Sequence, residues 1–314
     1  MTEGVRKNLT LNPWKETQGI IFKALLEYTQ TPIQEIHDLL FDKAGLRVLV
    51  KREDLNHPTV SGNKWWKLKY NLEEAKKLGY KTLLTFGGAY SNHIFSTAAA
   101  AHELGYESIG IIRGEEAHPL NPTLTFAKSR GMKLKYITRE AYRQKTNPDF
   151  IESLHMEFED FYLIPEGGTN ALAVKGVEEF AQTLGDEFDY LCCAVGTGGT
   201  LAGLINGIGS STEILGFSVL KGGEFLKDEV EKLIGKEAKN WSLVTDYHFG
   251  GYGKTTAALL EFIKDRLTKN NLPLDSVYTG KLVAGVYDLI EKGYFRRGAT
   301  ILMVHSGGLQ INRP

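Results

Sequence analysis

From about residue 46 onward, short apolar runs alternate with segments whose apolar residues recur at helical spacing. The first pattern predicts strands and the second predicts helices. The expected strands are Val48–Lys51, Thr82–Phe86, Ser108–Ile112, Lys133–Ile137, Tyr162–Ile164, Tyr190–Val195, Ile214–Val219, Leu243–Tyr247 and Thr300–Val304. The expected helices include Lys64–Leu78, Ile94–Leu104, Leu172–Leu184 and Leu201–Ile208. Such alternation predicts an α/β protein with open parallel sheets covered by helices.

Two details of the pattern agree with this class. The expected strands at 82–86, 108–112 and 300–304 are almost continuously apolar, as strands covered by helices on both faces tend to be. Glycine also follows the helix-like segments, where a left-handed C-terminal cap favours it. These glycines are Gly79, Gly105, Gly131 and Gly185.

Composition limits the partners of the chain. Lys and Arg number 37 against 38 Asp and Glu, so no global charge favours nucleic acid or an anionic membrane. The first residues lack the pattern of a signal peptide, and no apolar stretch approaches the roughly 20 residues that span a bilayer. We therefore expect a cytosolic (cytoplasmic) protein. Cys192 and Cys193 are adjacent in an apolar run, which favours buried, reduced thiols over a redox or metal site.

Lys64 is the first candidate for chemistry. It follows the turn-forming residues 61–63 and starts an expected helix. The interaction of an exposed ammonium with the helix dipole at this end is unfavourable by about 0.3–1 kcal/mol. Formation of an imine would remove much of this unfavourable interaction. Desolvation by Trp65 and Trp66 would also lower the pKa of the amine and favour its nucleophilic form. An ordinary surface lysine is the alternative.

A glycine-rich turn between an expected strand and an expected helix is the second candidate. It consists of Gly196, Thr197, Gly198, Gly199 and Thr200. Its backbone amides and the following helix N-terminus form a concavity suited to an anion. The run matches neither the GxxxxGK[ST] loop nor the GxGxxG fingerprint, so a single phosphate monoester fits better than a nucleoside triphosphate. A tight turn without a ligand is the alternative.

Further polar groups follow two other strands. Ser91, Asn92 and His93 lie beyond the strand at 82–86, and Ser306 lies beyond the strand at 300–304. Because ligands of open α/β sheets bind at the carboxyl ends of the strands, these groups should meet. Tyr252 and the Tyr278–Thr279 pair add polar groups from loops. For His93, a structural role and a catalytic role both remain open.

Taken in order, these segments resemble the fold-type II pyridoxal-phosphate enzymes, the family related to the tryptophan synthase β subunit. Within that family the chain is most similar to the D-cysteine desulfhydrase and 1-aminocyclopropane-1-carboxylate deaminase branch. The resemblance covers nearly the whole chain. Its motifs are TPIQ (31–34), KREDL (51–55), SGNK (61–64), GGAYSNH (87–93), IPEGGTN (164–170), VGTGG (195–199), VYTGK (277–281) and VHSGG (304–308).

The resemblance implies a pyridoxal 5′-phosphate cofactor held by Lys64 as an internal aldimine, with Lys64 later moving the α-proton. It implies that Asn92 bonds the cofactor's 3-hydroxyl and that Ser306 faces the pyridine nitrogen. The backbone of residues 196–200 would hold the phosphate, assisted by Asn63 or Lys67. The implied substrate contacts are Ser91, Tyr252 and Tyr278.

Departures from the branch narrow the expected reaction. Deaminases that open the cyclopropane ring carry Tyr-Glu where this chain has Tyr278-Thr279. The usual Thr-Arg after the lysine is here Trp65-Trp66, and the loop around Tyr252 lacks the usual prolines. The chain therefore leans towards β-elimination from a small amino acid, D-cysteine first, to pyruvate, ammonia and sulfide. Cyclopropane deamination and a non-catalytic phosphometabolite-binding protein are the alternatives.

The resemblance also implies two α/β domains with the cofactor between them. The large domain would comprise residues 1–64 and 169–314, and the small domain residues 65–168. The family's habit predicts a homodimer. No metal is expected.

Overall fold

The large sheet takes strands from both ends of the described chain. The computed structural model describes residues 26–312. In spatial order the six strands are β1 (Ile33–Ile36), β2 (Arg47–Lys51), β10 (Thr300–Val304), β7 (Tyr190–Val195), β8 (Glu213–Ser218) and β9 (Trp241–Val244). Neighbouring strands are parallel except for β1 and β2, which pair antiparallel at one edge.

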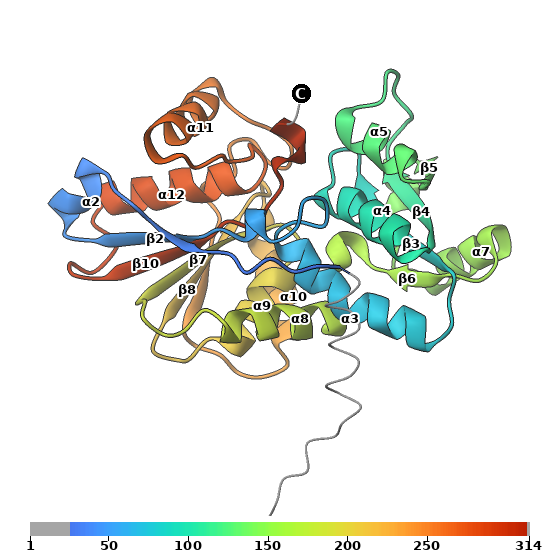
Figure 1. The fold of residues 1–314 in the computed structure, drawn as a ribbon, viewed down its shortest axis with the longest axis horizontal. Helices are drawn as coiled ribbons and strands as arrows, with labels where there is room; N and C mark the ends of the chain where they lie inside the picture. The colour runs from blue at the N-terminus through green and yellow to red at the C-terminus, as the bar shows by residue number, and fades with distance from the viewer. Residues whose placement is uncertain (1–25, 313–314) are drawn as a thin grey trace, which may run out of the picture.

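Helices cover both faces of the large sheet (Figure 1). One face carries α2 (Leu39–Ala44), α11 (Ala257–Asn270) and α12 (Thr279–Glu291), and the other carries α3 (Asn63–Lys77), α8 (Ala171–Gln182), α9 (Gly199–Gly207) and α10 (Leu226–Ile234). Successive strand residues enter opposite layers: Cys192 packs with the α12 side and Cys193 with the α8–α9 side. The two thiols are free and buried, as expected. Because their side chains point to opposite faces of the sheet, they do not pair with each other.

A second, smaller sheet lies beside the first (Figure 1). Its four parallel strands are, in spatial order, β5 (Lys133–Ile137), β4 (Glu107–Arg113), β3 (Thr82–Gly88) and β6 (Tyr162–Ile164). Helices α4 (Asn92–Leu104) and α5 (Pro122–Ser129) pack on one face through Ile94, Ala98 and Leu124. The short α6 (Arg139–Tyr142) and α7 (Pro148–Phe158) cover the other face through Tyr142 and Leu154.

Short 3₁₀ turns occupy four connections of the described chain. They are η1 (Glu53–Leu55), η2 (Glu166–Gly168), η3 (Gly223–Phe225) and η4 (Leu309–Asn312). The last of these contacts α5, so the C-terminal segment reaches across to the small sheet. Each of the four predicted C-cap glycines has a positive φ, between 74° and 84°.

The predicted α/β class with parallel sheets is confirmed, and two details differ. The strand expected at Leu243–Tyr247 is Trp241–Val244 instead, because its ladder with β8 runs from the Ile214–Trp241 pair to the Phe217–Val244 pair. The strand β1 was not expected, since its sequence IQEI is short and mostly exposed. Residues 1–25 of the expected large domain lie outside the described part. Between residues 26 and 312, no helix is both long enough and apolar enough to cross a bilayer.

Candidate active site

A cavity of about 770 Å³ opens between the two sheets, at the carboxyl ends of their strands. Its walls include Gly88 at the end of β3, Val195 at the end of β7 and Ser306 just after β10. The structure brings together there every site residue expected from the sequence except Gly199, which lies just behind the wall. Those lining the cavity are Asn63, Lys64, Lys67, Ser91, Asn92, Gly196, Thr197, Gly198, Thr200, Tyr252, Tyr278 and Ser306.

Lys64 occupies the first turn of α3 and faces this cavity. Its Nζ donates to Asn63 Oδ1 at 3.0 Å, and Asn63 Nδ2 in turn donates to Thr200 Oγ1 at 2.8 Å. Burial lowers the pKa of Lys64 to about 8, against the opposing effect of Asp275. A lysine with so low a pKa is partly neutral near pH 8, as a nucleophilic amine must be.

Trp65 and Trp66 are not the groups that desolvate Lys64. Both rings lie in the hydrophobic core, where the indole nitrogens donate to Leu26 O at 3.3 Å and Glu53 Oε2 at 2.8 Å. Consecutive helical residues point in different directions, so these side chains leave the cavity as Lys64 enters it. The tryptophans therefore anchor α3 in the core.

Gly62 allows α3 to start against the loop after β10. Its φ is 69°, and a Cβ at this position would lie 2.0 Å from the carbonyl oxygen of Ser306. The Asn63 amide donates to that same oxygen at 3.2 Å. The SGNK and VHSGG segments are therefore in direct contact, which brings Lys64 and Ser306 to one end of the cavity.

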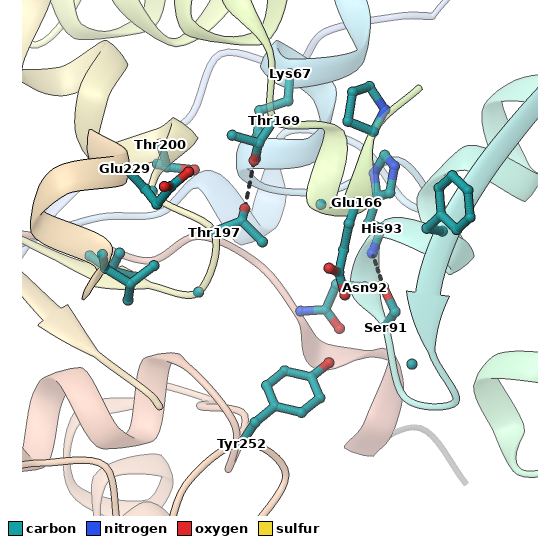
Figure 2. A pocket seen from close by; sticks show the side chains of 18 of the residues that line it. Lys67, Ser91, Asn92, His93, Glu166, Thr169, Thr197, Thr200, Glu229 and Tyr252 are labelled. Carbon is teal, nitrogen blue, oxygen red and sulfur yellow. Dashed lines mark hydrogen bonds between the residues drawn. The ribbon is translucent and has the colours of Figure 1, made fainter. Parts of the chain in front are cut away.

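The loop of residues 196–200 forms a polar cup at the N-terminus of α9, which we call the amide cup. Gly198 has a φ of 81°, and a Cβ on Gly199 would lie 3.2 Å from Lys67 Nζ, so the glycines let other groups approach closely. Lys67 Nζ donates to Thr169 Oγ1 at 2.9 Å, and the hydroxyls of Thr169 and Thr197 lie 2.6 Å apart (Figure 2).

Lys67 brings a second buried amine to this cup. Burial, and secondarily Lys64, holds the pKa of Lys67 well below its ordinary value. Two buried amines beside a helix N-terminus favour a bound anion, which would restore the ammonium form of Lys67. The exposed carboxylate of Glu229 lies beside Thr200 at the same end of the cavity (Figure 2). A phosphate monoester fits this concavity, as the sequence predicted.

Ser91 and Asn92 lie on the opposite wall, at the start of α4 (Figure 2). Ser91 is the N-cap of this helix, and its Oγ accepts from the amides of His93 and Ile94 at 3.2 and 3.3 Å. Asn92 Oδ1 accepts a hydrogen bond from Gln310 Nε2, which leaves the Asn92 amide nitrogen as the group able to donate to a ligand. Gln310 was not predicted, because it reaches Asn92 only through the tertiary fold.

His93 is buried in the same wall of the cavity. Its Nε2 lies 2.8 Å from Thr85 Oγ1, and burial holds its pKa well below the ordinary value. A Cβ on Gly168 would lie 3.1 Å from its ring. A neutral, hydrogen-bonded imidazole that joins α4 to β3 and η2 fits the structural interpretation of His93.

Tyr252 and Tyr278 border the cavity together. Their ring centroids are 6.1 Å apart. Burial raises the pKa of both phenols, so both are neutral hydrogen-bonding groups. The loop of Tyr252 is fixed by Lys281, whose Nζ donates to the carbonyl oxygens of His248 and Gly251 at 2.8 and 2.7 Å. That role of Lys281 was not predicted from the sequence.

Ser306 and Thr279 differ in what they face. Ser306 lines the cavity, whereas Thr279 is 1 % exposed and lies behind the wall. The Thr279 hydroxyl donates to Asp275 Oδ2 at 2.7 Å and accepts from the Asp275 amide at 2.9 Å. Asp275 is itself fully buried. Ser306 thus presents a neutral hydroxyl to the cavity, whereas the Asp275 carboxylate is buried and bonded to Thr279.

These residues fit a pyridoxal phosphate group. The amide cup and Lys67 match its phosphate, Lys64 matches its aldehyde, Asn92 can donate to its 3-oxygen, and Ser306 can meet its ring nitrogen. The fit rests on glycines where a side chain would fill the space: a Cβ on Gly308 would lie 2.6 Å from Asn92 Nδ2. Within residues 26–312 no group of three or more His, Cys, Asp or Glu side chains could hold a metal.

Comparison with known proteins gives the same assignment. The family model described as "Pyridoxal-phosphate dependent enzyme" matches residues 24–307. A Pyrococcus horikoshii protein, named 1-aminocyclopropane-1-carboxylate deaminase as a provisional assignment, is 33 % identical over 296 residues, covering 89 % of this chain and 90 % of the relative. The D-cysteine desulfhydrase of Salmonella newport is 30 % identical over 300 residues, covering 88 % and 91 %.

Solved structures agree. A crystal structure described as an ACC deaminase homologue superposes with a TM-score of 0.79 at 31 % identity, covering 96 % of both chains. A hydrogen sulfide-producing enzyme from Fusobacterium nucleatum has a TM-score of 0.68 at 15 % identity over 92 % of this chain and 98 % of the other, which shows the shared fold alone. With the cavity, its lysine and these matches combined, the chain belongs to the pyridoxal-phosphate-dependent enzymes of fold type II.

Proposed function

We propose that the protein catalyses β-elimination from a small amino acid, with D-cysteine as the first substrate to test. Cysteine and water would give pyruvate, ammonia and hydrogen sulfide. The bound cofactor supplies the electron sink that stabilises the substrate's carbanion. The observation that carries the proposal is Lys64, whose amine lines the cavity between the amide cup and the Ser91–Asn92 wall with its pKa lowered to about 8.

The proposed roles of the chain's residues follow from their positions. Lys64 would hold the cofactor by its aldehyde, and its amine is placed to remove the substrate's α-proton. The substrate carboxylate binds beside Ser91 at the N-terminus of α4, where the helix dipole favours an anion. Tyr252 and Tyr278 enclose the substrate side chain as neutral hydrogen-bonding groups.

The cofactor contacts are proposed on the same grounds. The amides of Gly196, Thr197, Gly198, Gly199 and Thr200 hold the phosphate together with Lys67 and Asn63. Asn92 donates to the 3-oxygen, since Gln310 fixes its amide orientation. Ser306 meets the ring nitrogen with a hydroxyl. A neutral partner leaves the ring less electron-withdrawing, which suits expulsion of a good β-leaving group.

Two α/β domains that share the site complete the proposal: residues 1–64 with 169–314, and residues 65–168. We also propose a cytosolic homodimer. Analytical ultracentrifugation of the holoenzyme tests the dimer, with a monomer at micromolar concentration as the contrary result.

The deciding experiment measures keto acid release from D-cysteine, L-cysteine and 1-aminocyclopropane-1-carboxylate side by side. We expect pyruvate and sulfide from D-cysteine, and no product from the Lys64→Ala variant. Turnover of the cyclopropane acid alone would replace the desulfhydrase proposal by the deaminase one. That second reaction is favoured by the provisional name of the Pyrococcus horikoshii relative, and disfavoured by Thr279 in place of a glutamate.

A binding protein without catalysis is distinguished by the cofactor itself. The wild-type protein should take up pyridoxal phosphate and become yellow, and borohydride should fix the label on Lys64. Lys64→Ala should lose the reducible label. Retention of the label in that variant removes the covalent role of Lys64, and a colourless wild type favours the binding protein.

A further inference from the structure

Arg113 is a cationic side chain in the cavity wall that no role above uses. It is the last residue of β4 and pairs in register with Gly88 at the end of β3. A Cβ on Gly88 would lie 3.5 Å from its guanidinium, so the exposed charged group lies close to the carboxyl end of β3. The carbon of the guanidinium lies 5.7 Å from the ring centre of Tyr252, which borders the same cavity.

The guanidinium of Arg113 is held in place without being neutralised. It lies 5.6 Å from the ring centre of Tyr142 as well, so two aromatic rings fix it by cation–π contact. Across residues 26–312 it makes no hydrogen bond or ion pair with another residue. All of its N–H donors therefore remain available to a ligand or to water.

The nearby carboxylate is already engaged. Glu166 Oε1 accepts from the Tyr142 hydroxyl at 2.8 Å, and Glu166 Oε2 lies 3.4 Å from Lys145 Nζ. Lys145 thus balances the charge of Glu166, and Arg113 remains the uncompensated cation of this wall. Planar guanidinium groups bind carboxylates and other oxyanions through paired N–H bonds.

The two anions of a cofactor–substrate complex already have separate binding places. The amide cup with Lys67 takes the phosphate on the large-sheet side, and the N-terminus of α4 beside Ser91 takes the α-carboxylate. Arg113 lies beside Gly88 and Tyr252, on the side of the cavity assigned to the substrate side chain. Arg113 is therefore positioned to bind a third anionic group.

We propose that Arg113 determines specificity by binding an anionic group on the substrate side chain. This inference rests on the proposed function and deepens it. In the elimination, loss of the α-proton leaves its electron pair to form the Cα=Cβ bond, while the Cβ–substituent bond breaks and the substituent departs with that bond's pair. Negative charge therefore grows on the β-substituent, where the guanidinium stabilises it. Side chains that are already anionic bind most tightly.

The test compares two ligands that differ in one charge. D-aspartate and D-asparagine have nearly the same shape, and neither carries a good leaving group. Calorimetric titration of the holoenzyme should give at least tenfold tighter binding of D-aspartate. Arg113→Gln should abolish this preference by weakening D-aspartate while D-asparagine changes less than twofold, and Arg113→Lys should retain part of it.

Arg130→Gln serves as the matched control. Arg130 also stacks on a ring, that of Phe126 at 5.0 Å, but does not line the cavity. This variant should bind both ligands as the wild type does.

The contrary outcomes are distinct. An equal loss for both ligands in Arg113→Gln means that Arg113 binds the α-carboxylate, which overturns the inference alone. Unchanged binding of both ligands in Arg113→Gln, or no preference for D-aspartate in the wild type, also overturns the inference and leaves the proposed function intact. A wild type that takes up no cofactor, or releases keto acid from no amino acid, overturns the proposed function and this inference with it.

Discussion

Lys67 Nζ donates to Thr169 Oγ1 at 2.9 Å, joining the first turns of α3 to the segment just before α8 at the edge of the amide cup. The amine is buried, its pKa is held well below its ordinary value by desolvation, and it has no carboxylate partner among the described residues. Keeping a buried amine charged without an anion is costly, so the amine of Lys67 gives up its proton readily in the empty protein. A bound phosphate would supply the missing charge.

Replacing Lys67 by methionine should therefore weaken pyridoxal phosphate binding by about ten- to a hundredfold, the equivalent of about 1.5–3 kcal/mol for a charge-assisted hydrogen bond. Pyridoxal, which lacks the phosphate, should bind both proteins alike. Fluorescence titration of the apoprotein measures both affinities. Lys69→Met is the matched control, because Lys69 lies on the same helix and pairs with Glu179 at 2.6 Å, away from the cavity. Equal weakening of pyridoxal would contradict the assignment.

The pKa of Lys64 sets the pH dependence of cofactor attachment. Burial lowers this pKa to about 8 in the empty site, so the reactive neutral amine increases about tenfold per pH unit below 8 and saturates above it. The rate of holoenzyme formation, followed by stopped-flow absorbance, should rise from pH 6 to 8 and then level off. With an ordinary lysine, the rate would keep rising up to about pH 10.4. A rate still rising tenfold per unit at pH 9.5 would show that the amine is not desolvated.

Thr279 can be tested by giving it the carboxylate found in cyclopropane-opening deaminases. Its hydroxyl donates to the buried Asp275 at 2.7 Å, so Thr279→Glu puts a second carboxylate and extra volume into a packed site. We expect a loss of about 3 kcal/mol or more in unfolding free energy, measured in urea, and no gain of cyclopropane deamination. Thr279→Ser keeps the hydroxyl and should lose about 1 kcal/mol at most.

The double variant Asp275→Asn with Thr279→Glu separates charge from volume. If the two carboxylates repel each other, it should be more stable than Thr279→Glu alone. A single Thr279→Glu variant that is as stable as the wild type and opens the cyclopropane ring would show that one residue decides between the two reactions.

The strands were predictable from the sequence where both of their faces are buried. The strand at Tyr190–Val195 alternates between two hydrophobic layers, so nearly every position is apolar and the run is easy to recognise. The two edge strands of the large sheet were harder, whereas β5 and β6 at the edges of the small sheet have the expected bounds. β1 has the sequence IQEI with two exposed positions, and β9 is half-exposed along Trp241–Val244, so neither carries a clear pattern. At these two edges, water takes the place of one neighbouring strand, so fewer side chains there need to be apolar.

The site was predictable where one contiguous segment carries the chemistry. Residues 196–200 and Lys64 could be recognised from the sequence because in each case the turn and the start of the helix are formed by neighbouring residues. The Gln310 and Arg113 contacts join segments far apart in the chain, and nothing local marks those residues. Trp65 and Trp66 show the opposite error: adjacency in sequence suggested contact with the Lys64 amine, but the helix turns them into the core.

Lys281 offers the last test, of the loop that carries Tyr252. Its amine is buried with a pKa lowered to about 8 by desolvation, and both of its hydrogen bonds go to carbonyl oxygens of His248 and Gly251. Neutral or charged, the amine has enough N–H groups for both bonds. Its removal leaves two carbonyls without a partner, so Lys281→Met should free this loop.

We expect Lys281→Met to lower kcat about tenfold or more while cofactor affinity stays within threefold, because Tyr252 borders the substrate and lies apart from the amide cup. Hydrogen exchange of the amides around Tyr252 should speed up in the variant and stay unchanged in α9. Lys254→Met, on the exposed part of the same loop, should alter neither quantity. Faster exchange without any change in kcat would show that the position of Tyr252 does not matter for the reaction, whereas a lower kcat with unchanged exchange would show that Lys281 acts on the reaction without holding the loop.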